Sequence, residues 1–119
     1  MSIVYVCGSF RFLEEMNALE KRLKEEGIEC MMPKSPDSQG ILGCLRKIDR
    51  ADVVYVVNPE GYVGKSVCVD IGYAYAKKKA IYTVHPIDDS IMRLITGVLS
   101  FEELVVLIRH CQRNREGQP

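Results

Sequence analysis

The chain has 119 residues, of which 47% are apolar and 27% charged, and its 16 lysines and arginines balance its 16 aspartates and glutamates. This length suits one globular domain with one core, and the composition is not that of a disordered chain. The balanced charge excludes the basic footprint of a protein that binds nucleic acid or anionic membrane. No apolar run approaches the roughly 20 residues that span a bilayer. We predict no nucleic-acid partner and no membrane partner.

The cysteines indicate a reducing compartment. Their number, five, is odd, and no two have the CxxC spacing, so a disulfide framework and a zinc site are both disfavoured. The sequence enters an apolar run at Ile3 without a preceding basic segment, which argues against a signal peptide. We therefore predict a cytoplasmic protein with reduced thiols, no metal site and no bound cofactor.

Apolar runs and amphipathic segments alternate along the chain. The apolar, β-rich runs predict strands over 3–7, 28–32, 52–57, 80–84 and 98–99. Segments with apolar residues at helical spacing predict helices over 11–26, 41–50, 67–78, 88–95 and 101–111. Gly27 is expected to end the first helix, and Ser100 with Glu103 forms a capping box for the last one. A polar loop is expected over 33–40.

This alternation predicts an α/β fold, with a parallel sheet of about five strands between two layers of helices. The expected type is Rossmann-like or flavodoxin-like, with strand order 2-1-3-4-5. We assign residues 1–112 to a single domain that binds a nucleoside or nucleotide, and residues 113–119 to a polar tail. In such sheets ligands bind at the carboxyl ends of the strands where the strand order reverses. The loops after the first and third strands meet at this point.

The first of these loops, Gly8-Ser9-Phe10-Arg11, opens a helix. Free backbone N–H groups and the helix dipole favour an anion there, and an arginine fork matches phosphate. A glycine turn with a capping serine and a solvated arginine is the alternative explanation. The full GxGxxG and GxxxxGK[ST] patterns are absent, which disfavours a dinucleotide site or a P-loop.

The second loop, over 58–66, leads from a buried strand into a helix that carries Asp70. If Ser66 is the N-cap, Asp70 lies about one turn into this helix, at the boundary between core and solvent. Asn58, Glu60 and Tyr62 could bind sugar hydroxyls or a base. An acid placed to complement the helix dipole is the alternative explanation for Asp70.

Five segments of residues 3–84, taken in order, resemble the nucleoside 2-deoxyribosyltransferase-like superfamily, which includes the 2′-deoxynucleoside 5′-monophosphate N-glycosidases. They are residues 8–11, 51–54, 61–66, 70–74 and 79–82. The resemblance implies cleavage or transfer of an N-glycosidic bond, with Asp70 as the nucleophile. It also implies that Ser9 and Arg11 hold a 5′-phosphate, and that the chain forms a homo-oligomer, a dimer or larger. The predicted substrate-binding residues are Gly8, Ser9, Phe10, Arg11, Asn58, Glu60, Tyr62, Gly64 and Ser66.

Two positions depart from this family. Its nucleophile is usually glutamate, one methylene longer than Asp70, and the position of a second acid in many of its hydrolases is matched here by Cys44. Asp37, Asp49 or Glu60 could replace that acid. These departures leave a second hypothesis open, a catalytically inactive module that binds or senses a nucleotide. A flavodoxin-like flavin binder is a third, which a colourless purified protein would exclude.

Overall fold

The computed structural model describes residues 2–33 and 40–116. Its centre is a five-stranded parallel sheet in the order β2-β1-β3-β4-β5. The strands are β1 (Ile3–Cys7), β2 (Glu29–Met31), β3 (Val53–Val56), β4 (Ala80–Thr83) and β5 (Gly97–Val98). The predicted α/β class and the predicted strand order are confirmed. Most of the loop expected over 33–40 lies outside the described residues.

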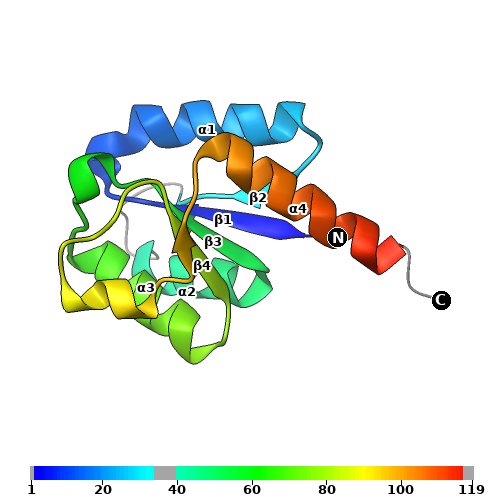
Figure 1. Cartoon of the computed structure of the whole chain (residues 1–119). Helices are drawn as coiled ribbons and strands as arrows, with labels where there is room; N and C mark the ends of the chain where they lie inside the picture. Colours follow the sequence, from blue (N-terminus) through cyan, green and yellow to red (C-terminus); the bar gives the residue numbers. More distant parts are fainter. Residues whose placement is uncertain (1, 34–39, 117–119) are drawn as a thin grey trace.

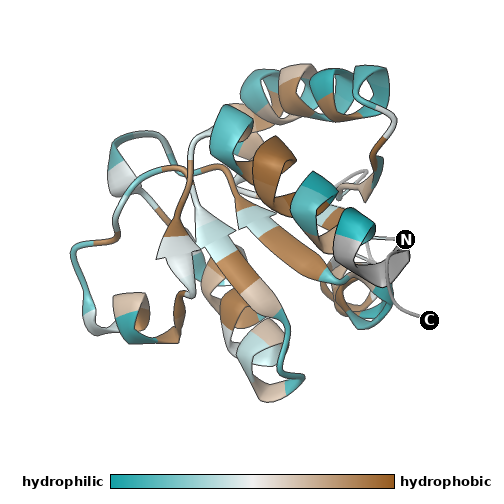
Figure 2. Ribbon diagram, turned by 45° about the vertical axis from the view of Figure 1, so that its right-hand side comes forward, coloured by the Kyte–Doolittle hydropathy of each residue, from teal (hydrophilic) through white to brown (hydrophobic). Residues whose placement is uncertain are grey.

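Helices cover both faces of the sheet. Figure 1 shows α1 (Leu13–Glu25) and α4 (Phe101–Glu116) on one side, and α2 (Gly40–Arg50) and α3 (Lys65–Ala76) on the other. In Figure 2 the strands carry brown apolar segments, whereas the helices alternate teal and brown along their length. This is the pattern of helices that bury one face and leave the other in water. No helix in the described part of the chain is long and apolar enough to cross a membrane.

The alternation of side chains along β1 determines which layer each residue meets. Val4 and Val6 are buried in the core beneath α1 and α4, whereas Tyr5 and Cys7 are buried on the face covered by α2 and α3. Successive side chains of a strand point to opposite faces of the sheet, so even-numbered residues of β1 face one helix layer and odd-numbered residues face the other. Cys7, at the carboxyl end of β1, is thereby directed toward α3.

The ends of the first and last helices match the prediction. Gly27 follows α1 with a φ of +74°, a conformation that glycine adopts without a Cβ clash. At the start of α4, the Glu103 N–H donates to Ser100 Oγ at 3.2 Å and the Ser100 N–H donates to Glu103 Oε1 at 3.0 Å. The capping box therefore forms.

Replacing Ser100 by Ala is expected to lower the free energy of unfolding by about 1 kcal/mol, because an N–H of the first turn loses its acceptor. Urea denaturation measures this change. Ser66→Ala is a matched control, because Ser66 lies inside the first turn of α3 and Gly64 is the N-cap there. The control should change stability by less than about 0.5 kcal/mol. Equal losses in the two variants would contradict the capping assignment.

Several predicted boundaries were wrong. The expected helix over 11–26 divides into a 3₁₀ turn, η1 (Phe10–Phe12), and α1. The third helix begins at Lys65, not at 67, because its first two residues are polar and exposed and so precede the apolar stripe. The segment expected as a helix over 88–95 contains a 3₁₀ helix, η3 (Ser90–Leu94), which Asp89 caps at the Ile91 N–H. The last helix continues to Glu116, past its expected end at 111.

Candidate functional site

A cavity of about 470 Å³ opens at the carboxyl end of the sheet, beside the point where the chain order reverses between β1 and β3. Its wall comes from the loop after β1, the segment after β2, helix α2, and the loop and first turns around the start of α3. The lining residues are Gly8, Ser9, Phe10, Pro33, Cys44, Tyr62, Gly64, Lys65, Ser66, Val67 and Asp70. This is the location that the topology predicts for a ligand.

Asp70 is the buried acid of this cavity. It lies in the second turn of α3 with 6% of its surface exposed, and the Cys7 thiol donates to its Oδ2 at 3.3 Å. Burial raises the pKa of the Asp70 carboxyl to about 6, and the hydrogen bond from Cys7 opposes that rise. A shift of this kind is typical of carboxyl groups that take part in chemistry, although structural acids also show it.

The groups that interact with Asp70 are neutral. Tyr5 and Cys7 come from β1 and Cys44 from α2, and burial raises the pKa of each of the three side chains. Among the described residues, the buried Tyr5 hydroxyl has no hydrogen-bond partner. Asp70 is therefore buried beside a phenol and two thiols, where a carboxylate interacts strongly with any positive charge that develops nearby.

The N-terminus of α3 forms the polar side of the cavity. Gly64 is its N-cap, with extended backbone, and a glycine supplies no side-chain cap to the first turn. The N–H groups of such a turn lack intrahelical partners and carry the positive end of the helix dipole. Lys65 and Ser66 stand on the same wall. This end of the cavity is suited to an anion, while Asp70 lies one turn further along the helix.

The loop after β1 forms the opposite wall and requires glycine at its start. A Cβ on Gly8 would lie 2.9 Å from both the Met16 sulfur and the Val57 carbonyl oxygen. Because the second of these is backbone, a side chain could not be accommodated without moving the chain where it leaves β3. Ser9 caps η1, and its Oγ accepts a hydrogen bond from the Arg11 N–H at 3.4 Å.

Arg11 does not line the cavity. Its guanidinium stands over the ring of Tyr62 at 4.5 Å and over that of Phe12 at 5.5 Å, and these two rings meet edge to face at 5.9 Å. The contacts join the loop after β1 to the loop after β3. The predicted phosphate-binding arginine thus stacks on aromatic rings in this structure.

Asn58 also lies off the cavity wall. It is fully buried, its amide N–H donates to the His85 carbonyl at 2.8 Å, and its Oδ1 accepts the His85 N–H at 3.0 Å. Glu60 is exposed at the tip of the loop with a φ of +58°. Next to it, Gly61 has a φ of +80°, and a Cβ there would lie 2.7 Å from the Pro86 carbonyl oxygen. Asn58 and Gly61 thus hold the loop against the segment that follows β4.

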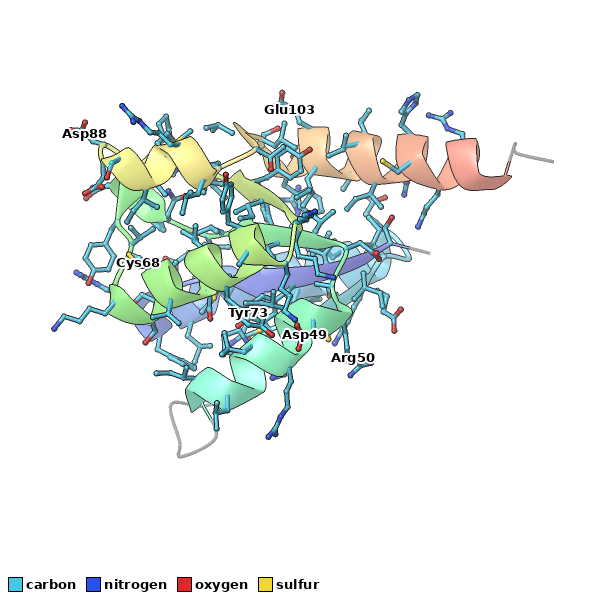
Figure 3. The ribbon with its side chains drawn as sticks, turned by 90° about the horizontal axis from the view of Figure 1, so that it is seen from below. Asp49, Arg50, Cys68, Tyr73, Asp88 and Glu103 are labelled. Carbon is cyan, nitrogen blue, oxygen red and sulfur yellow. The ribbon has the colours of Figure 1, made fainter. Side chains whose placement is uncertain are left out.

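The acids considered as partners for Asp70 are not on the described wall. Asp49 accepts a hydrogen bond from the Tyr73 hydroxyl at 2.7 Å and lies 3.7 Å from the Lys77 ammonium, in the seam between α2 and α3 (Figure 3). Asp37 lies outside the described residues. Within them, no group of three or more histidine, cysteine or acidic side chains is arranged to hold a metal ion.

Comparisons with known proteins bear on the fold. No protein-family model and no curated protein matches the sequence. A conserved protein from Enterococcus faecalis aligns with a TM-score of 0.68 at 17% identity, over 92% of this chain and 98% of that one. The Clostridium botulinum CMP N-glycosidase BcmB aligns with a TM-score of 0.59 at 18% identity, over 88% of this chain and 98% of that one.

A further alignment is with Vibrio vulnificus NanR complexed with ManNAc-6P, with a TM-score of 0.65 at 19% identity, over 87% of this chain but 43% of that one. The chain shares the fold of these solved proteins. At these identities the likeness extends to the fold alone.

Within this fold, the structure brings together most of the residues predicted from the sequence. Seven of them line the cavity: Gly8, Ser9, Phe10, Tyr62, Gly64, Ser66 and Asp70. Arg11, Asn58 and Glu60 do not. Sequence reasoning missed Pro33, Lys65 and Val67 on the wall and Cys7 beside Asp70. The alternation along the first strand contained the signal for Cys7, since it places Cys7 on the same face as Tyr5.

Proposed function

We propose that the chain cleaves or transfers the N-glycosidic bond of a nucleoside or deoxynucleoside, or of its 5′-monophosphate, with Asp70 as the nucleophile. The observation that carries this proposal is a buried carboxylate on the wall of the switch-point cavity, one turn from an uncapped helix N-terminus. At pH 7 a carboxyl group with a pKa of about 6 is about nine-tenths ionised, so Asp70 is available to attack.

In the proposed reaction, an Asp70 oxygen forms a bond to the anomeric carbon while the bond from that carbon to the base nitrogen breaks. The base leaves with the electron pair and takes up a proton. Water then attacks the glycosyl ester and releases Asp70 and the free sugar, or a second base does so and completes a transfer. This is the double displacement of retaining glycoside chemistry, and the neutral surroundings of Asp70 strengthen its attraction to an oxocarbenium-like centre.

The polar end of the cavity supports a phosphorylated substrate. The first turn of α3 offers backbone N–H groups and the Lys65 ammonium to an anion. The names of two solved proteins that align with this chain include a phosphorylated compound, the nucleotide CMP for one and the sugar phosphate ManNAc-6P for the other. A 5′-monophosphate bound at α3 would direct its sugar along the helix toward Asp70.

The test is incubation of the protein with a panel of nucleosides and their 5′-monophosphates, followed by chromatography of the released bases. We expect release of free base, with 5′-monophosphates preferred over the matching nucleosides. Adding a second base to the mixture distinguishes transfer from hydrolysis. Wild-type protein that releases no base from any member of the panel would overturn the proposal.

A non-catalytic nucleotide-binding module is the second candidate. Two observations favour it. The side chain of Asp70 is one methylene shorter than glutamate, and the described residues of the cavity wall include no second carboxylate. A reach that is short by about 1 Å is large on the scale of catalytic geometry. Calorimetry that detects binding of a 5′-monophosphate without base release would favour this module.

The prediction of a homo-oligomer stays a prediction, and sedimentation of the purified protein tests it.

A further inference from the structure

The contact between the Cys7 thiol and Asp70 joins two rigid elements. Cys7 is the last residue of β1, a strand that pairs with β2 on one side and with β3 on the other, where Cys7 is in register with Val56. Asp70 lies in the second turn of α3, which packs on the same face of the sheet. Both side chains are buried, and the sulfur lies 3.3 Å from Oδ2. Both residues thus belong to regular secondary structure, Cys7 to a strand and Asp70 to a helix, and neither lies in a loop.

The direction of this hydrogen bond is determined by its surroundings. Burial, and then the carboxylate of Asp70, raise the pKa of the Cys7 thiol well above its ordinary value, so the thiol keeps its proton and donates. Asp70 accepts through Oδ2. Its other oxygen, Oδ1, receives no hydrogen bond from the described residues, and Asp70 lines the cavity. The contact thus distinguishes the two carboxylate oxygens.

We propose that Cys7 is a positioning residue that holds Oδ2 of Asp70 so that Oδ1 faces the substrate and makes the attack. This inference rests on the proposed function and goes beyond it, because it specifies the attacking oxygen and the group that orients it. A thiol suits this task better than a hydroxyl. The C–S bond is longer than a C–O bond, so sulfur reaches the carboxylate without drawing it back toward the sheet. The extra reach matters for aspartate, which is shorter than glutamate.

The other groups that face Asp70 do not compete for this role. Tyr5 on β1 and Cys44 on α2 interact with it electrostatically, and both are neutral at neutral pH because burial raises the pKa of each. Neither donates a hydrogen bond to Asp70 in the structure, whereas Cys7 does. Removing the Cys7 proton donor therefore changes the environment of Asp70 without removing a charge.

The experiment compares wild type with Cys7→Ala and Cys7→Ser. Cys30→Ala is the matched control, since that thiol donates to the Glu20 carbonyl, remote from the cavity. The pKa of the Asp70 carboxyl is read by carbon NMR in the protein without substrate, and kcat/KM for base release is measured across pH. Cys7→Ala should raise the pKa of Asp70 by up to about one unit, move the acidic limb of the profile by the same amount, and lower kcat/KM about tenfold. The control should leave all three unchanged.

Cys7→Ser keeps the proposal falsifiable even where the alanine variant does not fold. Its hydroxyl is a stronger donor to a carboxylate, so the pKa of Asp70 should fall below that of wild type, while kcat/KM drops because the carboxylate is drawn back. The positioning role is overturned if either variant leaves the Asp70 pKa and kcat/KM as in wild type, or if Ser raises the pKa as much as Ala does. An inactive wild type would instead overturn the proposed function, and the positioning role with it.

Discussion

Replacing Asp70 by Asn is expected to make the protein inactive and, at neutral pH, more stable. An amide cannot form the glycosyl ester, so base release should fall at least about a thousandfold. Its stability should rise because the carboxylate is held in a pocket that disfavours its charge: burial raises its pKa from 3.8 to about 6. A difference of this size corresponds to about 3 kcal/mol between the charged and the neutral forms.

The pH dependence of this gain distinguishes it from a packing effect. The folded wild type binds more protons than the unfolded chain between the pKa values of 3.8 and about 6, so its stability falls as the pH rises through that window. Asp70→Asn carries no such proton. The variant should therefore exceed wild type by about 3 kcal/mol at pH 8 and by almost nothing near pH 3.

Urea denaturation at several pH values measures this difference. Asp88→Asn is the control, because Asp88 is an exposed aspartate beside η3, labelled in Figure 3. Its effect should stay within about 0.5 kcal/mol at every pH. An Asp70→Asn variant that is less stable than wild type at pH 8 would show that the charge of Asp70 is well solvated or paired. An Asp70→Asn variant with wild-type base release would exclude Asp70 as the nucleophile.

Asn58→Asp is expected to destabilise the protein by about 3 kcal/mol or more at neutral pH. The two side chains are nearly the same shape, so packing is preserved. The carboxylate would, however, face the His85 carbonyl oxygen, to which the Asn58 amide now donates at 2.8 Å. An uncompensated charge in a fully buried site costs far more than the lost hydrogen bond.

The loss should shrink in acid, because a protonated aspartate can again donate to the His85 carbonyl. Thermal or urea unfolding at pH 4 and pH 8 would show this recovery. Asn17→Asp makes the same chemical change on the exposed side of α1, and it should alter stability by no more than about 0.5 kcal/mol. A similar small effect at Asn58 would mean that the loop after β3 is not held by this side chain.

The sheet and the location of the site were predictable because they depend on features that are local in sequence. The near-continuous apolar run over 53–57 marks a strand buried on both faces, and alternating strands and helices impose a parallel order. That order alone places the loops after β1 and β3 side by side. The capping box at Ser100 needed no tertiary information either, since both partners lie within one turn.

The directions of side chains were harder to predict, because their partners are distant in sequence. A helical wheel put Asp70 at the edge of the core, whereas α2 packs against that flank of α3 and buries it. Asn58 was predicted to bind a ligand through its side-chain amide. In the structure, both the NH₂ and the oxygen of this amide are hydrogen-bonded to the backbone of His85, 27 residues later. Arg11 was predicted to bind phosphate with its guanidinium. In the structure, this group stacks on the ring of Tyr62 from the loop after β3.

The clamp between Asn58 and His85 separates the exposed tip of the loop after β3 from the wall of the cavity. It fixes the base of the loop after β3 to the end of β4, while the tip at Glu60 stays in solvent. The exposed side chain at Glu60 can therefore be exchanged without moving α3 and Asp70. For protein engineering this means that the tip of the loop can be redesigned while Asp70 keeps its place.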